Sequence, residues 1–97
     1  MSALRYYQAN PIVSCRDEGA DGAILFDPDR DETAILNPSG RVLWALLSEP
    51  RTVEELAAYL VAHYEGVTLE QAQQDVRAFL EALGDGFVNE VAAGGDA

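Results

Sequence analysis

Basic residues are scarce in this sequence, and lysine is absent. The 97 residues include 17 Asp and Glu against six basic side chains, which gives a net charge of −11. All six basic residues are arginines, and they are spread along the chain without forming a cluster. Nucleic-acid binding needs clustered cations that face the phosphates, and anionic membranes attract basic segments. The composition therefore argues against both nucleic acid and membranes as partners.

Cysteine and long hydrophobic runs are scarce too. The single cysteine, Cys15, has no partner for a disulfide within the chain, and one thiol makes no metal site. No run approaches the ~18 apolar residues of a membrane helix, and residues 1–7 lack the pattern of a signal peptide. We therefore expect a cytoplasmic protein, with Cys15 in a buried or half-buried apolar role.

Apolar residues make up 48% of the chain. This fraction is ordinary for a globular protein and excludes wholesale disorder. A chain of 97 residues supplies one core of modest size. We expect one domain over residues 1–91, followed by a flexible C-terminal tail of small and polar residues at 92–97.

Residues up to Asn37 have the pattern of strands and turns. Short apolar runs predict strands at 11–16, 23–27 and 32–36. The last two are joined by the short polar loop 28–31, which predicts an antiparallel hairpin. Strand 32–36 then lies at one end of the sheet. Its edge is either open to a partner strand or covered by a helix or by the N-terminal segment.

Acidic residues gather around the loop of this hairpin, at Asp27, Asp29, Asp31 and Glu32. A calcium loop of the EF-hand type needs a glycine at its sixth position and a glutamate at its twelfth. Counted from Asp27, these positions hold Glu32 and Pro38. Because the spacing fails, we expect a solvated turn.

The chain from Pro38 to Gly84 predicts three helices, each with a start signal. Asn37 before Pro38 predicts an N-cap, and Thr52–Glu55 and Thr68–Gln71 have the spacing of capping boxes. Apolar residues recur at helical spacing in each segment: Val42, Leu43, Leu46 and Leu47; Leu56, Leu60 and Val61; and Leu69, Ala72, Val76, Leu80 and Leu83. The order of elements predicts an α+β fold, with a small three-stranded antiparallel sheet followed by a three-helix winged-helix-like bundle.

No set of residues in the sequence forms a catalytic constellation. His63 has no acid, base or ligand partner at a suitable spacing, and we expect it at the surface near the end of the second helix. We identify no catalytic residue, no metal ligand and no cofactor-binding residue. The expectation is a protein that is not an enzyme.

Four segments, in order and with matching spacing, resemble the PqqD family. They are residues 25–28 (LFDP), 34–44 (AILNPSGRVLW), 51–56 (RTVEEL) and 75–80 (DVRAFL) with Leu83. The resemblance extends over roughly residues 10–90. It implies a chaperone without catalytic activity or cofactor that holds the leader of a ribosomally made precursor peptide.

The resemblance also implies the partners and the site. The leader is presented to a modifying enzyme, often a radical-SAM/SPASM maturase, in pyrroloquinoline quinone (PQQ) biosynthesis or in another pathway to a ribosomal peptide natural product (RiPP). It is expected to pair with strand 32–36 and to lie against the third helix. Alternation places Thr33 and Ile35 on one face of the strand and Ala34 and Leu36 on the other. The expected peptide-binding residues are Thr33, Ala34, Ile35, Leu36, Val76, Phe79, Leu80 and Leu83.

The alternative is a winged-helix DNA-binding regulator, which shares the general architecture. A recognition helix needs Arg or Lys on its exposed face. The third helix offers only Arg77, and its acidic residues are Glu70, Asp75 and Glu81. Charge therefore favours the peptide-binding function.

Overall fold

The computed structural model describes residues 5–84 and 86–91 of the chain. The flexible tail predicted at 92–97 lies outside the described residues. The elements, in order, are β1 (Tyr6–Ala9), β2 (Ser14–Asp17), the 3-10 helix η1 (Gly19–Asp21), β3 (Ala23–Asp27), β4 (Glu32–Leu36), α1 (Pro38–Leu46), α2 (Val53–His63), α3 (Leu69–Leu83) and β5 (Val88–Val91).

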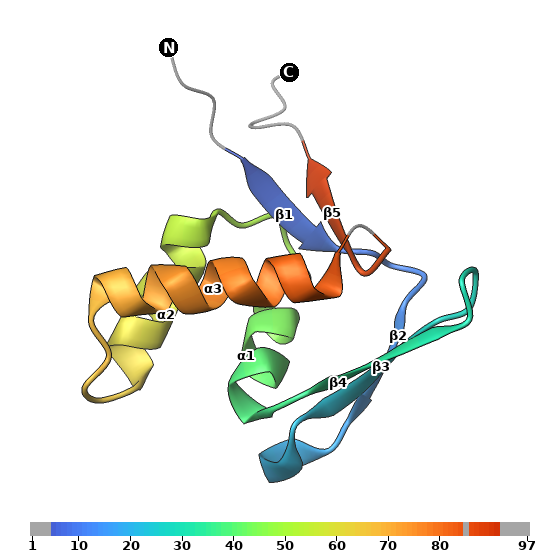
Figure 1. The fold of residues 1–97 in the computed structure, drawn as a ribbon, viewed down its shortest axis with the longest axis horizontal. Helices are drawn as coiled ribbons and strands as arrows, with labels where there is room; N and C mark the ends of the chain where they lie inside the picture. The colour runs from blue at the N-terminus through green and yellow to red at the C-terminus, as the bar shows by residue number, and fades with distance from the viewer. Residues whose placement is uncertain (1–4, 85, 92–97) are drawn as a thin grey trace.

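The strands form two separate antiparallel sheets; in Figure 1 the smaller lies above the right-hand end of α3 and the larger lies below it. The larger sheet has the order β2-β3-β4, with Leu25 of the central strand paired to Cys15 and to Ala34. The smaller sheet joins β1 to β5. Three strands, a second small sheet and three helices make an α+β fold, so the predicted class is confirmed. The predicted position of β4 at the end of its sheet is also confirmed.

The first strand of the larger sheet begins later than its sequence predicts. We expected it at 11–16, and the ladder begins at Ser14. The side chain of Asn10 accepts a hydrogen bond from the backbone N–H of Ile12, and the N–H of Val13 donates to the carbonyl of Asn10. These bonds make a turn in which the N–H groups of Ile12 and Val13 are used locally, so the ladder begins at the next residue.

The small sheet is the part of the fold that the sequence does not predict. The sequence pattern does not predict strand β1. The pairing of Tyr6 with Val91 joins the two ends of the described chain. Asn10 adds to this closure, since its side-chain amide donates to the carbonyl of Gly86 over 2.9 Å. Pairing between such distant segments leaves no local signal in the sequence.

The three helices begin where their caps predict. The side chain of Asn37 accepts a hydrogen bond from the N–H of Gly40 at 2.8 Å. Thr52 and Glu55 form the complete capping box, with reciprocal bonds of 3.0 and 2.9 Å. Of the predicted second box, the described residues form only the Thr68 half, in which its hydroxyl accepts from the N–H three residues later. These bonds satisfy N–H groups that a helix start otherwise leaves unpaired.

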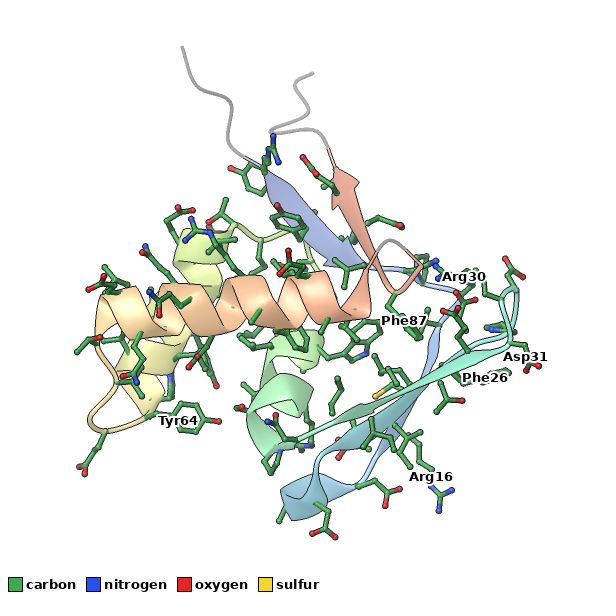
Figure 2. The ribbon with its side chains drawn as sticks, in the orientation of Figure 1. Arg16, Phe26, Arg30, Asp31, Tyr64 and Phe87 are labelled. Atoms are coloured by element: carbon green, nitrogen blue, oxygen red, sulfur yellow. The ribbon has the colours of Figure 1, made fainter. Side chains whose placement is uncertain are left out.

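The core lies between the larger sheet and the helices. Its fully buried large side chains are Leu25, Leu47, Leu56 and Val76, one or more from each packed layer. The ring of Trp44 is 9% exposed and belongs to the same cluster. Phe87, which follows α3, closes the end of this core beneath the small sheet (Figure 2).

Gly22, at the start of β3, is required by close packing. It has φ +110°, and a Cβ atom at this position would lie 1.9 Å from the carbonyl oxygen of Leu36. The backbone therefore approaches the end of β4 more closely than any side chain allows.

Two sequence expectations about polar residues are wrong. Asp27 is 1% exposed rather than solvated, because it lies on the core side of β3 and accepts a hydrogen bond from the N–H of Asp29. Cys15 is exposed rather than half-buried. It faces the same side of the sheet as Leu25, but all four residues of the edge strand β2 are exposed.

The stripe predicted for α3 also begins differently. Ala72 and Val76 are completely buried as expected, whereas Leu69 at the start of the helix is 52% exposed. No helix in the described part of the chain is long and apolar enough to cross a membrane.

Candidate functional site

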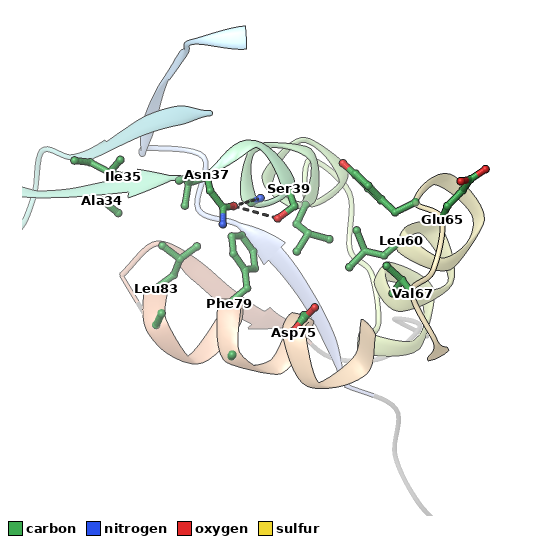
Figure 3. A pocket seen from close by; sticks show the side chains of 16 residues that line it. Ala34, Ile35, Asn37, Ser39, Leu60, Glu65, Val67, Asp75, Phe79 and Leu83 are labelled. Atoms are coloured by element: carbon green, nitrogen blue, oxygen red, sulfur yellow. Dashed lines mark hydrogen bonds between the residues drawn. The ribbon is translucent and has the colours of Figure 1, made fainter. Parts of the chain in front are cut away.

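A groove of about 750 Å³ opens between β4, the start of α1 and one face of α3 (Figure 3). It continues past α1 to the end of α2 and the loop that leads into α3. The residues that line it are Ala34, Ile35, Leu36, Asn37, Ser39, Gly40, Leu43, Leu60, Tyr64, Glu65, Val67, Asp75, Ala78, Phe79, Ala82 and Leu83. Most of these are apolar, and the volume is large enough for several side chains of a ligand.

Five of the eight predicted peptide-binding residues line this groove. They are Ala34, Ile35, Leu36, Phe79 and Leu83. The other three do not line it: Thr33 is exposed on β4, Leu80 is half-buried, and Val76 is completely buried in the core. Val76 thus supports the α3 wall from behind.

Strand β4 presents an open edge to the groove. Its alternation is as predicted, with Leu36 buried and Ala34 half-buried on the inner face, and Ile35 80% exposed on the outer face. Strand β1 does not cover this edge, because it pairs with β5 instead. Among the described residues, no backbone hydrogen bond joins β4 to any segment except β3. Half of the backbone donors and acceptors of β4 are therefore available to another strand.

The α3 wall combines predicted and unpredicted residues: Phe79 and Leu83 were expected to bind the peptide, whereas Asp75, Ala78 and Ala82 were not. The middle of the predicted stripe, Ala72 and Val76, turns toward the core, whereas the groove is lined by residues at spacings of three and four on the neighbouring face: Asp75, Ala78, Phe79, Ala82 and Leu83. A second stripe of this kind indicates that one face of α3 packs on the core and that a neighbouring face borders the groove. The two alanines keep the wall low between the larger side chains.

The start of α1 forms the floor at the point where β4 ends. Gly40 is buried there, and a Cβ atom on it would lie 3.3 Å from the Cβ of Leu36 and 3.4 Å from a ring carbon of Phe79. Asn37 and Ser39 are tied together at the rim, with the Ser39 hydroxyl donating to the Asn37 side chain over 3.1 Å (Figure 3). The polar groups at this end are thus engaged in capping the helix.

The charged groups lining the groove are carboxylates. Asp75 rises from α3 into the opening, and Glu65 stands at the far end on the loop after α2 (Figure 3). Arg41 of α1 is held outside by a 2.7 Å ion pair with Asp17. The hydrogen bond from Arg41 lowers the pKa of the Asp17 carboxyl, with the backbone N–H of Gly19 adding to the effect. This arginine is therefore occupied elsewhere.

The described residues contain no arrangement that is typical of a catalytic site or a metal site. No group of three or more His, Cys, Asp or Glu is placed to hold a metal within residues 5–84 and 86–91. His63 stacks on Tyr59 with ring centroids 3.9 Å apart and bonds to the carbonyl of the same residue. Cys15 is exposed, and partial desolvation raises the pKa of its thiol, so it is less nucleophilic than a free cysteine.

The architecture defines the class of protein: a small α+β domain with an open strand edge beside an apolar groove. The family model of coenzyme PQQ synthesis protein D (PqqD) matches residues 22–86, about two thirds of the chain. The chain belongs to the PqqD family. The matched range contains β3, β4 and all three helices, and thus the whole groove.

A solved structure described as lasso peptide synthetase B1 complexed with the leader peptide has a similar fold. The two share 23% sequence identity with a TM-score of 0.70, over 84% of this chain and 95% of the other. The search of curated proteins finds no match to the chain. The structural similarity shows that the overall fold is shared.

Proposed function

We propose that this protein is a peptide chaperone that binds the leader of a ribosomally made precursor peptide at β4 and presents it to a modifying enzyme. The single observation that carries the proposal is the open edge of β4 beside the apolar groove. Membership of the PqqD family and the likeness to a synthetase solved with its leader peptide support it. The protein itself contributes binding and no bond-making step.

The open edge of β4 suits the backbone of an extended peptide. A peptide that adds a strand there receives hydrogen bonds that are each worth ~0.5–1.5 kcal/mol net. It also covers the side chain of Ile35, which is 80% exposed without a partner. Backbone pairing gives affinity that depends little on the peptide sequence.

The groove supplies selectivity. Alternate side chains of an added strand point to opposite faces of the sheet. Those on the inner face are directed at the apolar lining formed by Leu36, Phe79 and Leu83. We include Thr33 and Ala34 as backbone contacts, and we assign to Val76 and Leu80 the support of the α3 wall.

The modifying enzyme is proposed from family membership. We propose a radical-SAM maturase, in PQQ biosynthesis or a related pathway to a ribosomal peptide natural product. A ribosomal precursor is modified where it is made, so the proposal carries a cytoplasmic location. Residues 1–91 act as the recognition domain in this proposal, with 92–97 as a tail.

Calorimetry with a cognate precursor tests the proposal. The precursor is sought as a short reading frame beside the gene of this protein and a maturase gene. We expect the leader, ~15–25 residues long, to bind and the core peptide to bind more weakly. Equal affinity for leader and core would contradict leader recognition.

A matched pair of variants tests whether the leader binds in the groove. Ala82→Trp fills the groove from the α3 wall, whereas Ala58→Trp adds the same side chain at an exposed position of α2 outside it. A misplaced large side chain costs ~1–3 kcal/mol, so we expect Ala82→Trp to weaken the leader complex about 10-fold or more. Ala58→Trp should bind as the unmodified protein does, and equal effects of the two variants would place the peptide elsewhere.

A further inference from the structure

We propose that the groove selects peptides that carry a Lys or Arg about four residues from an apolar anchor. The anchor enters the groove beside β4, and the cation reaches Asp75 and Glu65 at the other end. This inference rests on the proposed function and adds the chemical class of the peptide. It follows from the charge of the groove, from the pairing of the arginines and from the length of the α3 wall.

The two ends of the groove differ in chemistry. Beside β4 the lining is apolar, with Ile35, Leu36 and Leu83. Toward the loop after α2, the lining contains Asp75 and Glu65 together with the ring of Tyr64. No arginine lines the groove in the part of the chain that the structure describes. A peptide that lies along it thus passes from an apolar end to an anionic one.

The two carboxylates of the groove are unpaired among the described residues. Five of the arginines make ion pairs with other acids: Arg5 with Glu90, Arg16 with Glu18, Arg30 with Glu32, Arg41 with Asp17, and Arg51 with Glu49. Arg77, the remaining one, is exposed on α3 and does not line the groove. No arginine of the described residues therefore neutralises Asp75 or Glu65, and both carboxylates are open to a cation from outside.

The α3 wall sets the distance between anchor and cation. Leu83 and Asp75 are separated by eight positions of one helix, or about 12 Å along its axis. An extended peptide advances about 3.3 Å per residue, so about four residues bridge this span. The open groove also allows the long stem of a Lys or Arg to lie on the apolar surface while its head meets the carboxylate.

The charge of the whole molecule favours the same ligand. With a net charge of −11 the protein repels acidic peptides and attracts basic ones over a distance set by the salt concentration. Charge therefore favours basic peptides twice: the net charge of the protein attracts them during the diffusional encounter, and the carboxylates of the groove bind their cation in the complex.

Selection from a peptide display library tests the inference without knowledge of the precursor. The full-length protein is immobilised, and random peptides of ~15–25 residues are enriched over several rounds. We expect enriched sequences to contain an apolar residue with a Lys or Arg about four positions away. The Asp75→Asn/Glu65→Gln variant should enrich apolar peptides without this cation.

The outcomes separate the two proposals. Enrichment of apolar strand-forming peptides without a preferred cation would overturn this inference and leave the proposed function standing. Both proposals would be overturned if none of the enriched peptides bound more weakly to the Ala82→Trp variant than to the unmodified protein. Selection of acidic peptides would also overturn this inference, because it would reverse the sign of the charge preference.

A thermodynamic cycle then measures the contact itself. One selected peptide and its Lys→Gln counterpart are titrated against the unmodified protein, Asp75→Asn and the control Glu81→Gln, which removes a carboxylate from the same helix outside the groove. We expect Lys→Gln to weaken binding about 2- to 5-fold at low salt, and by much less against Asp75→Asn. An equal effect of Lys→Gln against Asp75→Asn and Glu81→Gln would show that the cation senses only net charge.

Discussion

Single residues fix the shape of the groove by what they exclude. Gly22 allows the backbone to approach the carbonyl of Leu36, where a Cβ atom would lie at 1.9 Å. Gly40 keeps the floor low beneath Phe79. Gly22 needs a residue without a side chain, whereas a Cβ atom at Gly40 would make tight contacts of 3.1–3.4 Å; both glycines pack against the end of β4. The open space beside β4 is thus a consequence of small residues at the junction.

Trp44 is the residue whose structural role is most directly testable. Its ring is 9% exposed and packs in the core cluster with Leu43 and Leu47. Trp44→Ala should lower the free energy of unfolding by ~3–5 kcal/mol, because the loss of a buried Trp leaves a cavity. Chemical denaturation measures this change. An unchanged midpoint together with lost peptide binding would instead make Trp44 a contact residue.

At the scale of elements, β4 serves both the sheet and the ligand. One row of its backbone groups bonds to β3, and the other faces the groove. Alternate residues point their N–H groups outward, so of Thr33, Ala34 and Ile35 either the middle one or the outer two face a partner. The two roles of the strand are thus separated residue by residue.

Proline substitutions in β4 test this separation. Proline at an outward position removes a donor that only the ligand uses. It should leave the fold largely intact and weaken the leader complex ~2- to 12-fold, the equivalent of ~0.5–1.5 kcal/mol for one hydrogen bond. Proline at an inward position should lower the melting temperature, because it removes a bond to β3. Circular dichroism and calorimetry on Thr33→Pro, Ala34→Pro and Ile35→Pro distinguish the two classes. An identical effect at all three positions would contradict strand addition.

Helix α3 divides its circumference between the core and the groove. Ala72 and Val76 on one face are completely buried, and Ala78 and Ala82 on the neighbouring face are exposed in the groove. Sequence periodicity predicts the first face, because apolar residues recur there. Periodicity does not predict the groove face, because alanine and aspartate also occur commonly on solvated helix surfaces.

At the scale of the whole molecule, local signals predict the elements and distant contacts decide the rest. The caps at Asn37, Thr52 and Thr68 act within three residues, so the helix starts are predictable from the sequence. The joining of β1 to β5 depends on residues at opposite ends of the domain, and no local pattern marks it. The same holds for the burial of Asp27, which depends on what packs above the sheet.

The candidate site follows the same division. The edge position of β4 is predictable, because a hairpin strand at the end of a short run of strands has one free side. The far half of the groove is not, because Leu60, Val67 and Asp75 come together only when α2 and α3 pack. Sequence reasoning consequently found the apolar anchor residues and missed the acidic end.

Amide hydrogen exchange with and without the leader is the most direct test of whether the leader pairs with β4. Leader pairing with β4 should slow exchange at the outward N–H groups of residues 32–36 and leave the opposite edge strand, residues 14–17, nearly unchanged. Both strands lie at an edge of the same sheet, so β2 serves as the internal control. We expect the leader to protect amides of β4 and of the groove face of α3 most strongly from exchange. Protection confined to β2 or to α2 would contradict it.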